Sequence, residues 1–545
     1  MRGPGVPQAR SAGAERGRGP RERRRWGPAG RSPPVRIERF VKILIANRGE
    51  IAVRIVRACR EMGIPSVAVY SDCDRTARHV REAGEAVHIG ANEAARSYLN
   101  IPAIVDAARR SGADAVHPGY GFLAENAAFA AACRDAGLIF IGPSPDAIAL
   151  MGSKTAARAA AIRAGVPVVP GTEQPFAADA PAAGIARSAA AIGYPLVVKA
   201  VAGGGGKGMR VVATPADLAS AIELARSEAG AAFGDSAVYL ERRLAHPRHV
   251  EIQLLADGFG GVVPFVEREC SIQRRHQKVV EESPSVVVDE ALRARIASAA
   301  ATVAAAVGYT SAGTIEFLLD QDGSFYFLEM NTRLQVEHPV TEMVTGVDLV
   351  QWQIRIARGE RLDLDPARAL TPRGHAIECR IYAEDPDQGF MPSPGLVRAL
   401  RPASGPGIRD DGGVTAGYAV PVYYDSLIAK LVAWANTRDE AIARMARALA
   451  EYQVLGIRTT IPFFVWLMRQ EDYRAARYDT TWLDGVLAAR RGRSFNELQP
   501  ADELLVTLAA AIDTYLRASA DAGQADGGAP SGHWRRAART EALRA

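Results

Sequence analysis

Short apolar segments alternate with amphipathic segments in the first patterned part of the chain, which begins at Val41. Apolar residues recur with a helical period over Ile51–Met62, which predicts an amphipathic helix. The strands expected around it are Val41–Ala46, Ser66–Tyr70, Ala113–His117 and Leu138–Ile141. Strands that alternate with helices form parallel sheets covered on both faces, so we predict a parallel α/β domain over residues 41–152.

The pattern changes after this domain, because the strands become longer and a glycine run interrupts them. The strands predicted here are Pro195–Ala200, Met209–Val212, Val238–Glu241, His249–Ala256, Val262–Glu267, Thr314–Leu319 and Ser324–Met330. Helices are expected at Pro215–Ala229 and, near the end, at Leu504–Leu516. We therefore predict an α/β chain of three domains, with a helix and a disordered tail over residues 491–545.

Charge is distributed unevenly along the 545 residues, whose formal net charge is +5. Residues 1–40 contain 11 arginines, three glutamates and no lysine, so the rest of the chain is mildly acidic. This basic leader is rich in glycine and proline and has no apolar period, which predicts disorder. A start codon assigned too far upstream is the favoured explanation, with a transit peptide as the alternative. Nucleic-acid binding through the leader is disfavoured, since aromatic residues do not interleave with the arginines.

Two further features place the chain among cytoplasmic proteins. No run of about 18 apolar residues occurs without charges, so no membrane span is predicted. The five cysteines are scattered and form no C-x-x-C pair, which indicates reduced thiols. We expect a cytoplasmic protein that binds neither membranes nor nucleic acids.

Lysine is rare in this sequence. The 66 Lys and Arg residues include six lysines: Lys42, Lys154, Lys199, Lys207, Lys278 and Lys430. A chain that uses arginine for nearly every surface cation is expected to keep lysine where a compact ammonium group is needed.

Lys199 precedes, and Lys207 lies within, a glycine-rich loop, Ala202–Met209, which lies between two predicted strands. Glycine backbone N–H groups can surround phosphate oxygens, and Lys199 and Lys207 would add compact positive charges. The loop is not a Walker A motif, because no Ser or Thr follows Lys207 and a strand comes next. A phosphate site is the favoured interpretation, and a flexible linker is the alternative.

A predicted hairpin places two carboxylates opposite each other. If Asp322-Gly323 forms a two-residue turn, Glu316 lies directly across from Glu329, and Asn331 shares the face of Glu329. Opposed like charges among apolar neighbours destabilise a strand pair. A cation such as Mg²⁺ or Mn²⁺ would resolve the conflict, and one proton shared by the two glutamates is the alternative.

Two polar segments add further candidate chemistry. Ser271–Glu282 is dense in charged and amide side chains, although a solvated charge run is the alternative interpretation. Arg333, Gln335 and Glu337 alternate directly after the second hairpin strand, so an extended backbone would direct all three to one side. An arginine, an amide and a carboxylate beside a phosphate site could bind and deprotonate a small oxyanion.

Over residues 41–490 the chain resembles biotin carboxylases, enzymes of the ATP-grasp superfamily. The segments that carry the resemblance are Ile45–Glu50, His117–Asn126, Gly203–Met209, Arg248–Gln253, Gln273–Glu282, Glu329–Glu342, Gly374–Arg380 and Tyr423–Ser426. The domains it implies are an N-terminal domain (41–152), an ATP-grasp domain (153–350) with a lid (171–243), and a C-terminal α+β domain (370–490). Lys207 stands where many members have arginine, which keeps the charge.

The resemblance also implies a role for each candidate residue. Those implied to bind ATP are Lys154, Lys199, Gly204, Gly205, Gly206, Lys207, Gly208, Met209, Glu241, Arg242, Leu244, His249, Gln273 and His276. Those implied to surround one or two Mg²⁺ or Mn²⁺ ions are Glu316, Glu329 and Asn331. Those implied to bind bicarbonate are Lys278, Arg333, Gln335 and Val336. The implied catalytic residues are Glu337 as the base, Arg333, Lys278, and Arg380, which would bind biotin and stabilise its negative charge.

The lysine pattern bears on how biotin would arrive. Biotin is attached to proteins through lysine, and no lysine follows Lys430, which lies in a predicted buried strand. We therefore expect no biotin carrier domain at the C-terminus. The resemblance implies a homodimeric protein that works with a separate biotin carboxyl carrier protein and a carboxyltransferase. Acetyl-CoA carboxylase is the expected complex, and propionyl-CoA, methylcrotonyl-CoA and two-subunit pyruvate carboxylases are the alternatives.

Overall fold

The computed structural model describes residues 41–172, 174–177, 179–201, 208–233, 236–496 and 500–525. Its first domain contains a parallel sheet of order β3-β2-β1-β4-β5. The strands are β1 (Ile43–Ile45), β2 (Ser66–Ser71), β3 (Glu85–Gly90), β4 (Ala115–His117) and β5 (Ile139–Phe140). The helices are α1 (Gly49–Glu61), α2 (Arg78–Glu82), α3 (Ile101–Ser111), α4 (Ala127–Asp135) and α5 (Pro145–Gly152).

Both faces of this sheet are covered by helices. Ile43 and Ile45 of β1 pack with residues of α1, whereas Leu44 packs with residues of α3 and α4 on the opposite face. Successive strand residues point to opposite faces, so a strand buried on both sides is apolar throughout. The predicted parallel α/β arrangement of this domain is confirmed.

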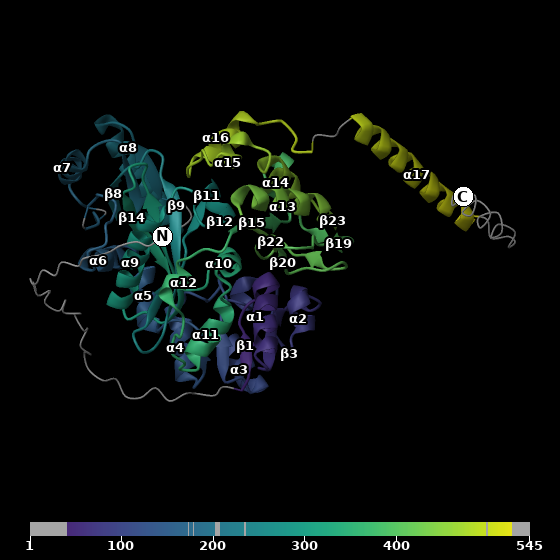
Figure 1. The fold of residues 1–545 in the computed structure, drawn as a ribbon, viewed down its shortest axis with the longest axis horizontal. Coiled ribbons are helices and arrows are strands. Elements are labelled where there is room, and N and C mark those ends of the chain that lie inside the picture. Colours follow the sequence, from purple (N-terminus) through teal and green to yellow (C-terminus); the bar gives the residue numbers. More distant parts are fainter. Residues whose placement is uncertain are drawn as a thin grey trace, which may run out of the picture.

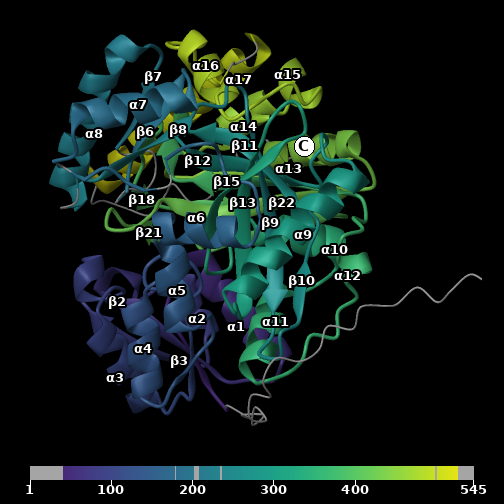
Figure 2. The same ribbon diagram turned by 90° about the vertical axis from the view of Figure 1, so that its left-hand side faces the viewer.

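A smaller antiparallel sheet of order β7-β6-β8 follows the first domain along the chain. It contains β6 (Leu196–Ala200), β7 (Met209–Val212) and β8 (Val238–Arg242), with α7 (Ala182–Ile192) and α8 (Leu218–Phe233) packed on it. Figure 2 shows these helices on the outer side of the sheet. The helix predicted from Pro215 starts later, because Pro215–Asp217 forms a 3₁₀ turn first.

A nine-stranded sheet connects the middle of the chain with its C-terminal part. Its order is β14-β13-β9-β11-β12-β15-β22-β20, with β10 paired to β9. The strands are β9 (Arg248–Ala256), β10 (Val262–Pro264), β11 (Arg268–Arg274), β12 (Gln277–Ser283), β13 (Ser311–Leu319), β14 (Phe325–Asn331), β15 (His375–Tyr382), β20 (Ile408–Gly412) and β22 (Leu427–Ala435). Because β12 pairs with β15, residues from both parts of the chain share one surface. The strand predicted to reach Glu267 ends at Pro264.

Helices and short hairpins complete the molecule. The remaining helices are α6 (Lys154–Arg163), α9 (Glu290–Ala306), α10 (His338–Thr345), α11 (Leu349–Ala357), α12 (Pro366–Ala369), α13 (Arg438–Glu451), α14 (Ile461–Leu467), α15 (Glu471–Arg474), α16 (Trp482–Ala489) and α17 (Pro500–Ala525). The short strands are β16 (Glu384–Asp385), β17 (Met391–Pro392), β18 (Gly395–Leu396), β19 (Ala399–Arg401), β21 (Ala419–Val420) and β23 (Gln453–Leu455). The predicted helix at Leu504–Leu516 is part of the longer α17, which lies apart from the domains in Figure 1. Within the described ranges, no helix is both long and apolar enough to cross a membrane.

Candidate active site

The predicted pair of opposed carboxylates lies on β13 and β14. Glu316 is the cross-strand partner of Glu329, and Asn331 Nδ2 donates a hydrogen bond of 2.8 Å to Glu316 Oε1. The predicted two-residue turn is wrong: Asp320 N donates to Ser324 O (2.8 Å), which closes a three-residue loop. A bulge between Glu316 and Phe317 shifts the pairing by one residue and brings the carboxylates opposite each other.

The pKa values of the two carboxylates shift in opposite directions. Burial and the charge of Glu316 raise the pKa of Glu329. Burial also acts to raise the pKa of Glu316, but Lys278 and His249 outweigh it and lower that pKa. The ammonium group of Lys278 therefore offsets part of the repulsion between the two carboxylates. A buried carboxylate (Glu316), a half-buried carboxylate (Glu329) and the amide oxygen of Asn331 are a donor set that fits Mg²⁺ or Mn²⁺.

Lys278 lies at the centre of the buried charges. Its Nζ lies 2.5 Å from Glu251 Oε2, 2.9 Å from Glu316 Oε1 and 2.7 Å from Glu337 Oε1. Burial opposes the charge of Lys278, yet these carboxylates hold its pKa well above the usual value. Glu251 is also bound by Arg268, which is fully buried, so this carboxylate is already neutralised and is a poor metal ligand.

His249 and Gln273 lie beside this cluster. His249 Nε2 is 3.1 Å from Glu316 Oε2, and its Nδ1 is 3.0 Å from Gln273 Nε2. Gln273 is in turn the strand partner of Lys278. Both residues, expected at the nucleotide, thus lie next to the metal-site candidates. The Ser271–Glu282 segment is buried except at the turn around Arg275–Gln277, so it is not a solvated charge run as a whole.

The side chains of Arg333, Gln335 and Glu337 converge as predicted, but their backbone is not an extended strand. The chain turns after β14, and Glu337 precedes the first residue of α10. Arg333 Nη1 donates to Gln335 Oε1 (2.8 Å), and Gln335 Nε2 donates to Glu316 Oε1 (3.1 Å). Burial acts to raise the pKa of Glu337, but Lys278 and then Arg380 and Arg268 hold it well below its usual range.

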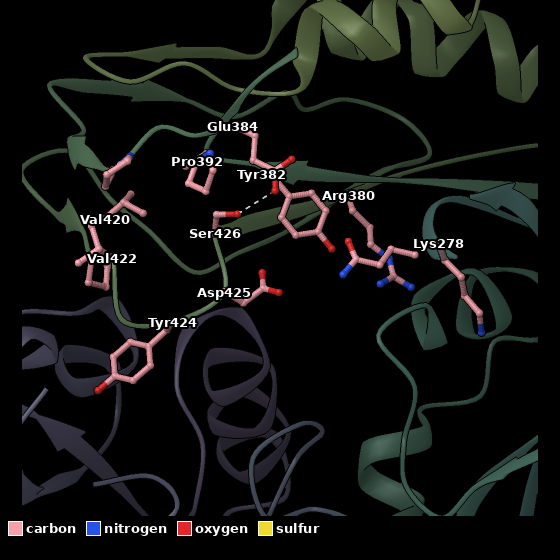
Figure 3. Close-up of a pocket in the computed structure, with 14 residues that line it drawn as sticks. Lys278, Arg380, Tyr382, Glu384, Pro392, Val420, Val422, Tyr424, Asp425 and Ser426 are labelled. Carbon is pink, nitrogen blue, oxygen red and sulfur yellow. Dashed lines mark hydrogen bonds between the residues drawn. The ribbon is translucent and has the colours of Figure 1, made fainter. Parts of the chain in front are cut away.

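Arg380 connects this cluster to the C-terminal part of the chain. From β15 its Nη2 lies 2.5 Å from Glu281 Oε1 and 3.0 Å from Glu337 Oε2. Burial, opposed by Arg380, raises the pKa of Glu281 to about 7. Two cavities, of about 560 Å³ and about 500 Å³, share Arg380 in their walls. Figure 3 shows Arg380 and Lys278 on one side of the first cavity.

Strand β6 and helix α6 each contribute a lysine that was expected to bind ATP. Lys199 Nζ lies 2.5 Å from Glu241 Oε2, and Arg158 Nη1 lies 3.2 Å from the other oxygen, Glu241 Oε1. Lys154 begins α6, where burial lowers its pKa although Glu329 acts to raise it. Lysines with depleted hydration beside carboxylates are suited to binding phosphate oxygens.

The other residues expected to bind ATP make fewer contacts with the carboxylates of the site. Arg242 Nη2 donates to Tyr326 Oη (3.2 Å), and Leu244 is half-buried just beyond β8. Gly208, at φ +74°, donates its N–H to Glu228 (3.1 Å) at the start of the strand containing Met209. His276 is exposed in the turn between β11 and β12. The candidates outside the described residues are Gly204, Gly205, Gly206 and Lys207.

Several partners of the site were not predicted from the sequence. Glu125 of the first domain binds Arg333 Nε (2.8 Å) and accepts from the Thr332 N–H (2.9 Å). Lys430 Nζ donates to the carbonyl of Val336 (3.0 Å). Glu251 could have been found, because strand alternation places it on the same face as His249. Contacts between distant segments, such as Glu125 with Arg333, leave no local pattern.

Comparisons with known proteins assign the class and then the family. Residues 153–365 match the ATP-binding domain of the carbamoyl-phosphate synthase L chain, which places the middle of the chain among ATP-grasp enzymes. Residues 39–148 and 378–485 match the N-terminal and C-terminal domains of biotin carboxylase. The chain belongs to the biotin carboxylase family.

Individual relatives agree with this assignment. A biotin carboxylase of Nostoc is 53% identical over 445 residues, which covers 82% of this chain and 99% of that protein. A pyruvate carboxylase subunit from Methanothermobacter thermautotrophicus is 49% identical, and the match covers 88% of this chain and 99% of that protein. A solved complex of Campylobacter jejuni biotin carboxylase with β,γ-ATP has a TM-score of 0.79 at 46% identity, covering 82% of this chain and 99% of its own.

A second solved relative contains nucleotide and bicarbonate. It is the biotin carboxylase domain dimer of the Hydrogenobacter thermophilus 2-oxoglutarate carboxylase, in complex with MgADP, ADP and bicarbonate. Its TM-score is 0.79 at 46% identity, covering 85% of this chain and all of that chain.

Proposed function

We propose that the chain carboxylates biotin on a separate carrier protein, with bicarbonate as the carboxyl source and ATP as the driving reactant. The observation that carries this proposal is the convergence of Arg333, Gln335 and Glu337 with Lys278 beside the Glu316–Glu329 pair. Solved relatives in complex with ATP, MgADP and bicarbonate support the same choice of reactants.

The lid and the carboxylate pair would hold the nucleotide. Lys154, Lys199 and the glycine loop around Lys207 would bind the phosphates, and the nucleotide pocket would include Glu241, Arg242, Leu244 and His276. Glu316, Glu329 and Asn331 would hold one or two Mg²⁺ or Mn²⁺ ions. When bound, these ions would neutralise charge on the transferred phosphoryl group.

Glu337 would act as the base. Lys278 and Arg380 hold the pKa of Glu337 well below its usual range, which keeps the carboxylate charged. A bicarbonate anion bound by Lys278, Arg333 and Gln335 would compete for these cations, and the pKa of Glu337 would rise. The carboxylate could then remove the bicarbonate proton while a bicarbonate oxygen attacks the γ-phosphorus of ATP.

The remaining steps transfer the carboxyl group. Attack on ATP gives ADP and carboxyphosphate, which splits into CO₂ and phosphate. The phosphate takes the N1 proton of biotin, and N1 then attacks CO₂. Arg380 would stabilise the negative charge that develops on biotin, because its guanidinium lies at the wall shared by both cavities.

The test is ATP hydrolysis with free biotin, in the presence and absence of bicarbonate. Hydrolysis should require bicarbonate, and Glu337→Gln should lower the rate at least about 100-fold while MgATP binding changes less than threefold. Glu360→Gln, which alters a half-buried carboxylate paired with Arg355 (2.7 Å), is the matched control and should keep full activity. Hydrolysis that proceeds equally without bicarbonate would contradict the reaction.

The final acceptor depends on the partner proteins. We propose an acetyl-CoA carboxylase that supplies malonyl-CoA, in which this chain is a homodimer that serves a separate carrier and carboxyltransferase. A two-subunit pyruvate carboxylase is the second candidate, because the match to the Methanothermobacter relative covers 88% of this chain against 82% for the Nostoc relative. Co-purification of the partner and assay with acetyl-CoA and pyruvate would separate the two.

A further inference from the structure

A second pair of opposed carboxylates lies between β12 and β15, next to Arg380. Glu281 of β12 is the cross-strand partner of Glu378 of β15, and both side chains are fully buried. Directly opposed residues of an antiparallel strand pair have Cβ atoms about 5 Å apart. Two charged carboxylates at these positions would therefore repel each other strongly in surroundings of low dielectric.

The two members of this pair have different neighbours. Glu281 Oε1 forms an ion pair with Arg380 Nη2 (2.5 Å), whereas Glu378 forms neither an ion pair nor a hydrogen bond within the described residues. The apolar side chains packed over this part of the sheet are Val340 and Val344 of α10, Ala376 of β15 and Val432 of β22. The other titratable groups that act on the pair or feel its charge are Cys270 of β11, Lys278 of β12, Glu337 before α10, Cys379 and Tyr382 of β15, and Lys430 of β22.

One proton shared by the pair removes the repulsion, and the neighbours decide which carboxylate carries it. Burial raises the pKa of Glu378 well above its usual range, although Lys430 opposes the rise. Burial also raises the pKa of Glu281, but Arg380 limits that rise to about 7. Glu378 therefore keeps its proton at neutral pH, and Glu281 becomes the anion as the pH rises through about 7.

We propose that Glu281 is a positioning residue for Arg380, and that Glu378 holds the proton that the opposed pair shares. The inference rests on the proposed function, in which Arg380 stabilises the negative charge that develops on biotin. Arg380 reaches the wall of the first cavity (Figure 3), where its Nη2 lies between Glu281 (2.5 Å) and Glu337 (3.0 Å). Once Glu337 has taken the bicarbonate proton, it is neutral and attracts Arg380 less strongly. Ionised Glu281 is then the carboxylate that keeps the guanidinium in place.

The pH dependence of kcat/KM for free biotin, at saturating ATP and bicarbonate, tests this role. In the parent protein kcat/KM should rise with pH through about 7, because Glu281 ionises and fixes Arg380. Glu281→Gln is neutral at every pH, so the rise should disappear and KM for biotin at pH 8 should increase at least about tenfold. KM for bicarbonate should change less than about threefold, since Lys278, Arg333 and Gln335 are unaltered.

Two further variants separate charge from shape. Glu281→Asp restores the carboxylate, so it should recover part of the affinity for biotin and the rise with pH. Glu378→Gln copies a protonated carboxyl group, so the rise should stay near pH 7. Asp106→Asn, which alters an exposed carboxylate paired with Arg110 (2.7 Å), is the matched control for loss of a carboxylate and should behave as the parent.

Four outcomes would overturn the inference. A KM for biotin in Glu281→Gln within twofold of the parent would show that Arg380 does not depend on Glu281, and an equal increase in KM for bicarbonate would assign Glu281 to the stability of the whole cluster. Loss of the rise with pH in Glu378→Gln but not in Glu281→Gln would make Glu378 the titrating member. A parent kcat/KM for biotin that is constant from about pH 6 to pH 8 would exclude the role even if Glu281→Gln does not fold. Failure of the proposed function is distinct, since the parent would then carboxylate no biotin at any pH.

Discussion

Charged side chains buried in this molecule are stabilised by clusters of partners rather than by single pairs. Asp74 is fully buried, and it accepts from Arg48 (2.6 and 2.9 Å), from Tyr98 Oη (2.7 Å) and from Tyr418 Oη (2.7 Å). Burial acts to raise the pKa of Asp74, but Arg48 outweighs it and holds that pKa well below the usual range. Because Tyr418 comes from the C-terminal part of the chain, this cluster also joins two domains. A buried charge that loses one partner from such a cluster is destabilising.

Asp74→Asn is therefore expected to lower the free energy of unfolding by about 3–5 kcal/mol at neutral pH. The depressed pKa of Asp74 contributes stability above the pKa of the unfolded chain, about 3.9, and this stability is lost as pH falls. The difference in melting temperature between parent and variant should accordingly be constant from pH 7 to about pH 5 and shrink as the pH falls below about 4. Asp72→Asn, at an exposed carboxylate beside His88 (2.8 Å), should change stability by less than about 1 kcal/mol. A pH-independent difference for Asp74→Asn would contradict the assignment.

Hairpins show how far local patterns determine the site. Strand alternation and a two-residue turn predict that Glu316 lies opposite Glu329. The structure confirms that the two residues are cross-strand partners, but the two-residue turn is wrong. The loop contains three residues, with Gly323 at φ +79°, and the bulge beyond Phe317 compensates for the extra residue. Alternation alone does not reveal a bulge, because the partner strand decides which residue is left unpaired. The turn between β11 and β12 was not predicted either, since neither Arg275 nor His276 favours it.

This β11–β12 turn has two adjacent non-glycine residues in the left-handed region, Arg275 at φ +51° and His276 at φ +64°. Each costs roughly 1 kcal/mol relative to glycine, and such strain persists mainly where function requires the side chain. Arg275→Gly and His276→Gly should both raise the melting temperature. If His276 contacts the nucleotide, His276→Gly should also raise KM for ATP at least threefold, whereas Arg275→Gly should leave it unchanged. An unchanged KM in both variants would remove His276 from the ATP site.

At the scale of the whole molecule, one buried lysine joins the three parts of the chain. Lys430 of β22 is fully buried, forms an ion pair with Glu50 of α1 (3.1 Å) and donates to the carbonyl of Val336 (3.0 Å). The scarcity of lysine predicts that each lysine is kept where a compact ammonium group is needed. For Lys430, however, the sequence indicates only that it lies in a buried strand and does not identify its partners. Its partners are 380 and 94 positions away in the chain, so no local pattern could identify them. The fold class followed from periodicity, whereas these contacts depend on how the domains pack.

Lys430 is therefore a positioning residue for the segment that presents Gln335 and Glu337. Lys430→Met removes the hydrogen bond to Val336 and leaves the carboxylate of Glu50 buried without its cation. Burial already raises the pKa of Glu50 to about 7 against the opposing charge of Lys430, so Glu50 should become protonated in the variant. KM for bicarbonate should rise at least tenfold while KM for ATP changes less than threefold.

The double variant Lys430→Met/Glu50→Gln separates positioning from stability. It removes the buried carboxylate as well, so the melting temperature should recover towards that of the parent, while KM for bicarbonate stays raised because the bond to Val336 is still missing. Lys42→Met, which breaks a more exposed pair with Glu85 (2.6 Å), is the control for loss of a lysine and should match the parent in both constants. Recovery of KM together with stability in the double variant would mean that Lys430 acts only by neutralising Glu50.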